Sequence, residues 1–293
     1  MNVLTVDVED HFHVEAFAAH ISQDQWESHE SRVERNVARI LELFARYEAK
    51  GTFFMLGWVA QKFPRLSRQI AAAGHEIGCH SFAHRRLQKM TPDQFRIDLR
   101  KATRYLEDQI QQPIRCYRAP SFSVVKSTSW ALDILAEEGY TIDSSVFPVR
   151  HDLYGVPDAP RFPHLQETFS GNRIFEFPPS TIRCGNANLG VAGGGYLRFL
   201  PYNVTYWAVR RINEVEGQSA MVYFHPWEID SDQPRIQAGF RSRVRHYTNL
   251  SGTHRKIERL LKDFTFTTLS RACTLHSSYQ TLNVKALSAT RSV

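Results

Sequence analysis

Two histidines four residues apart, His80 and His84, are the residues in this sequence best suited to holding a metal ion. They follow a short apolar run that ends at Cys79. On one turn of helix, side chains four apart point the same way, so both imidazoles would face one cation from the same side. A catalytic divalent ion needs a third protein ligand, usually a carboxylate, and an open position for water. The rest of the chain must therefore supply a carboxylate, a base and an acid.

Three carboxylates suited to these roles follow an apolar run at residues 3–6, in the segment Asp7-Val8-Glu9-Asp10. In an extended strand, residues two apart share a face, so Asp7 and Glu9 point the same way. This alternation favours Glu9 as the third metal ligand and leaves Asp7 as the base. Asp10 is kept as the alternative ligand, since the alternation holds only if the strand continues to Glu9.

Three more polar residues, Arg118, Asp143 and His225, come directly after or at the end of later apolar runs. Arg118 is expected to hold Asp7 ionised and oriented by charge pairing. A histidine near its ordinary pKa suits the protonation of an amine leaving group, which makes His225 the candidate acid. A carboxylate partner raises the pKa of a histidine, and Asp143 is expected to orient His225 in this way.

The elements that must position these residues alternate between apolar strands and amphipathic helices. Strands are expected at 3–6, 51–57, 76–79, 114–117, 141–145, 174–178, 220–224 and 264–268. Helices are expected at 33–49, 59–73, 91–111, 127–139, 202–216 and 254–263. Such alternation favours a parallel sheet or barrel. In α/β barrels the active site lies at the carboxyl ends of the strands, which is where the polar groups fall here.

Length and composition agree with one large α/β domain. The chain has 293 residues, of which 42% are hydrophobic, and we find no internal repeat. No run of 18 apolar residues indicates a transmembrane helix, and the N-terminus lacks the pattern of a secretory signal. The cysteines are dispersed, which argues against a disulfide framework. Together these features predict a cytoplasmic protein. The dispersed cysteines are Cys79, Cys116, Cys184 and Cys273.

The net charge of +6 is unevenly distributed, with basic residues concentrated in the C-terminal quarter. A solvated face is the simplest interpretation, and a surface for an anionic partner or a membrane face is the alternative. Nucleic acid is not expected, because no recognition motif accompanies the charge. We expect a barrel over 1–272, with a basic extension from about 235, and a polar, disordered tail over 273–293. The basic residues are Arg235, Arg241, Arg243, Arg245, Arg255, Lys256, Arg259 and Lys262.

Taken together, these motifs resemble the polysaccharide deacetylase family with the NodB homology domain, carbohydrate esterase family four. The resemblance runs from Asp7 to about Glu228 and implies a distorted (β/α) barrel with about seven parallel strands. The segment 7–10, the segment 224–230 and the basic C-terminal segment also resemble a subgroup found with exopolysaccharide biosynthesis loci of the exosortase/PEP-CTERM type. The motifs that carry the family resemblance are residues 5–10, 51–57, 74–84, 118–120, 143–145 and 224–226.

The resemblance implies a metal-dependent deacetylase that hydrolyses N-acetyl groups of an amino-sugar polysaccharide or its precursor. Its substrate would be an acetylated glycan, with a backbone N–H at Ser121 helping to hold the oxyanion. Phe122 and Trp227 are expected to form walls of the substrate pocket. The family pattern has two adjacent aspartates, whereas Val8 follows Asp7 here, so the chain departs from the family at its third metal ligand.

Two histidines and one carboxylate suit zinc, with cobalt, nickel and manganese as alternatives. Two other functions fit the same fold. One is a metal-free amidohydrolase acting on a ureide, and the other is a glycan-binding module without catalysis. Metal analysis distinguishes the metal-free amidohydrolase from a deacetylase. An assay of acetate release distinguishes the glycan-binding module from a deacetylase. The sequence does not indicate an oligomeric state or a particular acetylated glycan.

Overall fold

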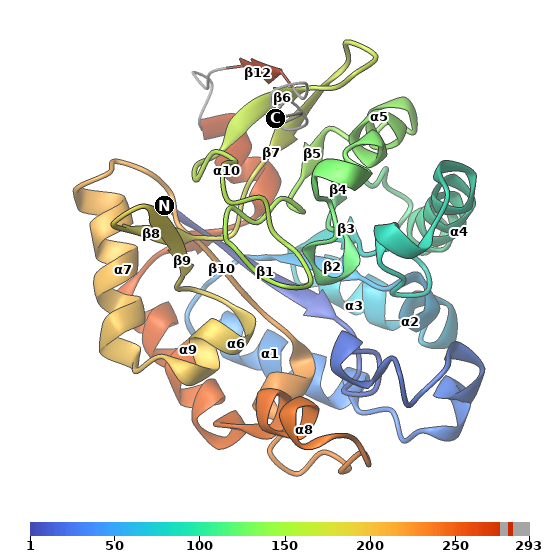
Figure 1. The fold of residues 1–293 in the computed structure, drawn as a ribbon. Coiled ribbons are helices and arrows are strands. Elements are labelled where there is room, and N and C mark those ends of the chain that lie inside the picture. The colour runs from blue at the N-terminus through green and yellow to red at the C-terminus, as the bar shows by residue number, and fades with distance from the viewer. Residues whose placement is uncertain (276–280, 284–293) are drawn as a thin grey trace.

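A curled, mostly parallel sheet organises the chain in the computed structural model, which describes residues 1–275 and 281–283 (Figure 1). Parallel strands lie side by side in the order β10-β1-β2-β3-β4-β5-β7. Strand β6 adds to β7 in the antiparallel direction, and β12 pairs parallel with β6. The sheet forms a half-barrel, and the expected α/β fold with about seven parallel strands is confirmed.

The strands and helices have these bounds. The strands are β1 (Asn2–Val8), β2 (Thr52–Met55), β3 (Glu76–Cys79), β4 (Cys116–Tyr117), β5 (Ile142–Asp143), β6 (His164–Glu167), β7 (Arg173–Glu176), β8 (Thr181–Cys184), β9 (Ala187–Gly190), β10 (Met221–Phe224), β11 (Phe266–Thr267) and β12 (Thr281–Asn283). The helices are α1 (Val33–Arg46), α2 (Gly57–Lys62), α3 (Leu66–Ala72), α4 (Pro92–Ile110), α5 (Trp130–Glu137), α6 (Gly194–Phe199), α7 (Tyr202–Glu214), α8 (Phe240–Tyr247), α9 (Leu250–Asp263) and α10 (Leu269–Leu275).

Strand β1 lies inside the part of the sheet that carries the candidate site. Every residue of β1 is buried, and the strand pairs with β10 on one side and β2 on the other. Val6 lies opposite Phe224 of β10, and Val8 lies opposite Met55 of β2. Because parallel strands end at the same edge, the residues that follow β1, β3, β4 and β10 come together there.

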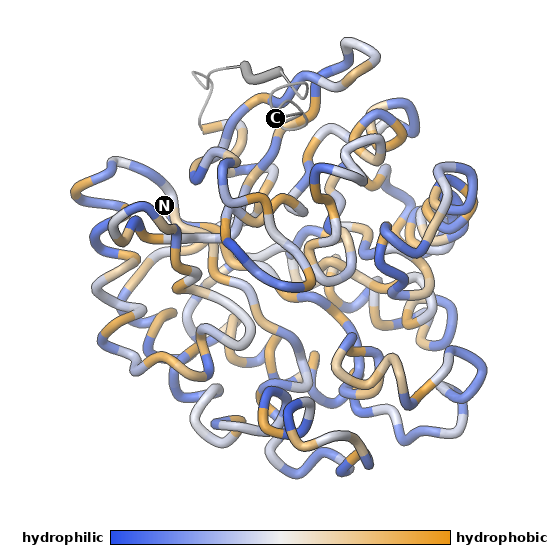
Figure 2. The backbone as a smooth tube through the Cα atoms, in the orientation of Figure 1, coloured by the Kyte–Doolittle hydropathy of each residue, from blue (hydrophilic) through white to orange (hydrophobic). Residues whose placement is uncertain are grey.

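The helices cover the outside of the sheet (Figure 1), and the buried residues of α1, α4 and α9 are mostly apolar. Helix α4 shows why they form. Thr91 caps its N-terminus by accepting a hydrogen bond from Gln94 N (3.3 Å), as the capping-box pattern predicts. Phe95, Leu99 and Leu106 are buried at helical spacing. The alternation of hydrophilic and hydrophobic colours along such helices is visible in Figure 2.

The predicted helix over 59–73 is wrong as a single element. The structure has α2 and α3 there, separated by three residues that include Pro64. Proline lacks the backbone N–H that a helix interior needs, and it disfavours helical backbone in the residue before it. Phe63 accordingly has φ −124° and ψ 69°. The break turns the chain before β3.

Residues 148–200, where the sequence predicts only a strand at 174–178, contain β6, β7, the hairpin β8–β9 and α6. Of the expected tail, 273–275 belong to α10 and 281–283 form β12. The helix extends past residue 272 because Leu269 and Ala272 are buried against the sheet. The remaining tail residues, 276–280 and 284–293, lie outside the described residues. No helix within 1–275 is long and apolar enough to cross a membrane.

Candidate metal centre and active site

His80 and His84 lie in the loop that follows β3, and their imidazole ring centroids are 5.3 Å apart. The prediction that they share a turn of helix is wrong. Ser81 (φ 61°) and His84 (φ 50°) have left-handed backbone, so the loop folds back on itself and still brings the two rings together. His80 N donates to the Met55 carbonyl (3.0 Å), which anchors the loop to the end of β2.

Glu9, His80 and His84 form a cluster with the geometry of a metal centre. Each offers one ligand atom, these atoms lie within 4.8 Å of one another, and all three residues are buried. His80 Nδ1 donates to the Arg118 carbonyl (2.8 Å), which leaves Nε2 for a ligand. Glu9 Oε2 lies 2.9 Å from His84 Nε2 without the alignment of a hydrogen bond, as is typical of two atoms that face a common ion. This donor set fits a divalent cation.

The charges of this cluster are coupled. Burial opposes the negative charge of Glu9, but the imidazoles of His84, His225 and His80 outweigh it and hold the pKa of Glu9 below its usual value. Burial lowers the pKa of His80 to about 4, so its ring is neutral at pH 7. A neutral imidazole is the form that binds a metal.

Asp10, the alternative ligand, points away from the histidines. Its carboxylate accepts hydrogen bonds from Ser31 Oγ (2.5 Å) and from Arg32 N (2.8 Å). Burial raises its pKa to about 6 in spite of these bonds. The geometry therefore favours Glu9, which β1 carries to the same edge as Asp7.

Arg118 forms the expected ion pair with Asp7, with 2.7 Å between Nη1 and Oδ1. The guanidinium is wholly buried after β4. It also donates to Thr5 Oγ1 (2.8 Å), to the Ser144 carbonyl (3.2 Å) and to Ser144 Oγ (2.9 Å). Arg118 thus fixes one oxygen of Asp7, and the other, Oδ2, lies 3.8 Å from His225 Nε2.

Replacement of this guanidinium should destabilise the protein strongly. We expect Arg118→Met to lower the free energy of unfolding by about 3–5 kcal/mol, because Asp7 would be left as an unpaired buried charge. Arg210→Met is the matched control, since the Arg210–Glu214 pair (2.7 Å) lies exposed on the surface of α7, where screening by water leaves an ion pair little effect on stability. Urea denaturation of both variants measures the difference. Equal stability losses would contradict this account of Arg118.

His225 follows β10 and directs Nε2 toward the two carboxylates of β1. That atom is 3.5 Å from Glu9 Oε1, and Nδ1 donates to Glu228 Oε2 (3.0 Å). Burial opposes a positive charge on the ring, but the hydrogen bond and charge of Glu228, with the charges of Glu9 and Asp7, raise its pKa to about 9. The protonated ring suits an acid.

The prediction that Asp143 orients His225 is wrong. Asp143 Oδ1 accepts from Ser145 Oγ (2.5 Å) and Oδ2 from Ser145 N (3.3 Å). Strand β5, which carries Asp143, is separated from β10 by β1, β2, β3 and β4. Glu228 takes the orienting position because it is only three residues from His225. The signal is in the sequence: Pro226 and Glu228 after His225 form a capping-box pattern, and Glu228 Oε2 accepts from His225 N (2.9 Å).

Trp227 contacts the cluster itself as well as lining the cavity. Its indole Nε1 donates to Glu9 Oε1 (3.4 Å). The ring stacks between His225 and His246, with centroids 5.1 and 4.2 Å away. Sequence reasoning predicted a pocket wall at Trp227 but missed His246, which packs here from α8 about twenty residues later.

These groups open onto a cavity of about 500 Å³. Ser121 and Phe122 line it with left-handed backbone (φ 54° and 50°), so the loop after β4 turns sharply at this point. Aromatic rings missing from the prediction complete the wall, and three of the four come from segments before residue 200 that have no clear pattern. The expected residues in the lining are Asp7, Glu9, His80, His84, Ser121, Phe122, His225 and Trp227; the further aromatic ones are Tyr154, Tyr196, Phe199 and Tyr223.

Two family models match this chain, one in each half. The family model described as polysaccharide deacetylase matches residues 23–142. Residues 23–142 therefore resemble the polysaccharide deacetylase family. A second model, described as a domain of unknown function (DUF3473), matches residues 144–274. The deacetylase match contains His80, His84 and Arg118, whereas His225 and Glu228 lie in the second match. The candidate site is therefore built by both matched segments.

Individual relatives support the same family. A peptidoglycan-N-acetylglucosamine deacetylase of Bacillus cereus is 27% identical over 118 residues, which cover 36% of this chain and 43% of the relative. The chain thus aligns with less than half the length of that relative. A structure from Mycobacterium smegmatis, described as a candidate polysaccharide deacetylase, has a TM-score of 0.60 at 19% identity and covers 96% of this chain and 92% of its own. Puue allantoinase has a TM-score of 0.57 at 18% identity, with 84% and 74% covered. The two structures share the fold.

Proposed function

We propose that the chain is a metal-dependent deacetylase that hydrolyses N-acetyl groups of an amino-sugar polysaccharide or of its precursor. The observation that carries the proposal is the convergence, in one cavity, of the cluster Glu9, His80 and His84 with Asp7 and His225. The buried carboxylate of Asp7 can act as a base and the nearby imidazole of His225 as an acid, one on each side of a scissile amide.

The residues have separate roles in this proposal. A divalent cation bound by Glu9, His80 and His84 would lower the pKa of a water and polarise the acetyl carbonyl. Asp7 removes the proton as the water oxygen bonds to the carbonyl carbon, and Arg118 keeps the carboxylate oriented. The backbone N–H of Ser121 donates to the developing oxyanion. His225 protonates the nitrogen as the carbon–nitrogen bond breaks, which yields acetate and a free amine.

The substrate class follows from the cavity and the relatives. Its aromatic lining gives flat apolar surfaces of the kind that pack against ligand rings. The Bacillus cereus relative is named for a peptidoglycan N-acetylglucosamine substrate, and an Azorhizobium caulinodans relative, 33% identical over 82 residues, for chitooligosaccharides. We infer that an N-acetylated glycan is also the substrate here. We propose that the reaction belongs to exopolysaccharide biosynthesis. Zinc is the proposed ion, because two imidazoles and one carboxylate suit it.

Acetate release from a panel of substrates tests the proposal. The purified chain should release acetate from N-acetylglucosamine oligomers, and free amines should appear in equal amount in the products. The panel includes allantoin, because the ureide hydrolase alternative predicts turnover there, and an O-acetylated glycan. Hydrolysis of allantoin without acetate release from the oligomers would overturn the proposal, and so would binding of the oligomers without any turnover.

A further inference from the structure

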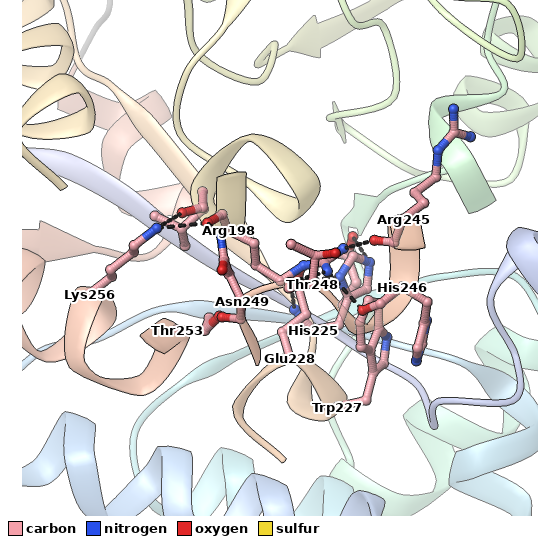
Figure 3. Close-up of polar contacts among 12 residues, drawn as sticks. Arg198, His225, Trp227, Glu228, Arg245, His246, Thr248, Asn249, Thr253 and Lys256 are labelled. Carbon is pink, nitrogen blue, oxygen red and sulfur yellow. Dashed lines mark hydrogen bonds and ion pairs between the residues drawn. The ribbon is translucent and has the colours of Figure 1, made fainter. Parts of the chain in front are cut away.

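Arg198 is a buried arginine, and each of its three guanidinium nitrogens donates to a protein group (Figure 3). It comes from α6, which forms one wall of the cavity. Its Nε donates to Glu228 Oε1 (2.6 Å). Its Nη1 donates to the carbonyls of His246 (2.8 Å) and Thr248 (3.1 Å), and its Nη2 to the carbonyl of Arg245 (2.9 Å). One side chain thus joins a carboxylate to three carbonyls at the end of α8.

Glu228 connects Arg198 to the candidate acid. Its Oε1 is held by Arg198, and its Oε2 accepts from both Nδ1 and the backbone N of His225. The carboxylate is completely buried. Burial opposes its charge, but His225 and Arg198 hold its pKa below the usual value. A buried carboxylate with both oxygens engaged has one orientation, so the imidazole that it holds has one orientation too.

The carbonyls that Arg198 binds are those a helix leaves without partners at its C-terminus. They belong to Arg245 and His246 in the last turn of α8 and to Thr248 just beyond it, and Figure 3 shows the Arg245 side chain pointing away from Arg198. Both Arg245 and His246 line the cavity. The C-terminal end of α6 is anchored by Lys256 of α9, whose Nζ donates to the carbonyls of Leu197, Arg198 and Leu200 at 2.7–3.0 Å.

We propose that Arg198 is a positioning residue. It fixes the position of Glu228, and through Glu228 that of His225, relative to the cavity wall made by α6 and α8. This inference rests on the proposed deacetylase function. It gives the segment matched as a domain of unknown function a role in catalysis, since that segment supplies the acid, its orienting carboxylate and the arginine that fixes both. Arg198 acts through Glu228 and is not itself a proton donor in the reaction.

A comparison of leaving groups separates positioning from general structural support. Amide hydrolysis needs a proton on the leaving nitrogen, whereas 4-nitrophenyl acetate releases a phenolate that needs none. In Arg198→Met, kcat for an N-acetylglucosamine oligomer should fall by about 100-fold, because a shift of about 1 Å in an acid has this effect. On 4-nitrophenyl acetate the same protein sample should lose less than about threefold. Metal content, measured in that sample, should stay at the wild-type value.

Two further variants keep the test decisive. Glu228→Gln leaves the three carbonyl bonds of Arg198 in place, so it should show the same split between substrates even if Arg198→Met folds poorly. The double variant should lose no more than either single variant on the amide, since both act through His225. Arg161→Met is the matched control: Arg161 also joins a glutamate, Glu216 (3.0 Å), to a backbone carbonyl, that of Thr181 (2.6 Å), but is not part of the cavity lining.

The outcomes distinguish the two proposals. An Arg198→Met enzyme that loses the same factor on both substrates, or none on the amide, would overturn the positioning role and leave the deacetylase function intact. A loss in Arg161→Met equal to that in Arg198→Met would also overturn it. If the wild-type protein releases no acetate from any N-acetylated sugar, both the proposed function and this inference are overturned.

Discussion

Asp7→Asn should lower kcat for acetate release from an N-acetylglucosamine oligomer by about 1000-fold, the usual contribution of a general base. The asparagine keeps the shape of the side chain and can still accept the Arg118 hydrogen bond at Oδ1. It cannot take a proton from water at Oδ2, the atom that faces His225. Steady-state kinetics at several substrate concentrations measure the change, and KM should move much less than kcat.

The control for this variant is Glu216→Gln. Glu216 is also a shielded carboxylate paired with an arginine, Arg161, but it lies apart from the residues that line the cavity. Its kcat should stay within about threefold of the wild type. Metal content should be unchanged in both variants, because neither residue belongs to the cluster of Glu9, His80 and His84. If the Asp7→Asn enzyme keeps at least a tenth of the wild-type kcat, Asp7 is not the general base.

His80→Ala should abolish stoichiometric metal binding and, with it, acetate release. The wild-type chain is expected to carry about one divalent ion per molecule. His80 supplies one of three ligands, and its Nε2 is the ring nitrogen left for the ion once Nδ1 donates to the Arg118 carbonyl. Inductively coupled plasma mass spectrometry of the desalted protein gives the metal content directly, independently of any substrate.

Two variants control for this effect. His75 is another buried histidine, directly before β3, where it packs against Phe44 and Phe53. His75→Ala should lose stability but keep its metal. Asp10→Asn should also keep its metal, because Asp10 faces Ser31 and Arg32. Full metal content in His80→Ala, or its loss in Asp10→Asn, would contradict the ligand set assigned from the geometry.

Most of the strands that carry the site could be predicted from the sequence, because each is a short, buried apolar run followed by a polar residue. Because parallel strands end at one edge of the sheet, the polar residues that follow them are expected to lie close together in space. The pairing of Arg118 with Asp7 could be anticipated for the same reason, since both residues stand at strand ends and carry opposite charges. Periodicity and edge geometry are local properties, so they can be read from sequence.

Features that depend on backbone conformation or on distant packing could not be predicted in this way. The spacing of His80 and His84 fits a helix, but the left-handed backbone at Ser81 and His84 is set by the surrounding loop. The contact of Arg198 with Glu228 joins residues thirty positions apart through the packing of α6. No periodicity marks either residue. The assignment of Asp143 as the partner of His225 failed because β5 lies far from β10 in the sheet, whereas Glu228 follows His225 by three residues and accepts from its Nδ1.

The measurement that tests the central claim most directly is acetate release from an N-acetylglucosamine oligomer by one protein preparation in three states. These are the metal-loaded protein, the same protein after chelator and desalting, and that protein after addition of about one equivalent of zinc, with metal content determined for each. The account predicts that turnover disappears with the metal and returns with it. Undiminished acetate release by protein shown to be free of metal would contradict it.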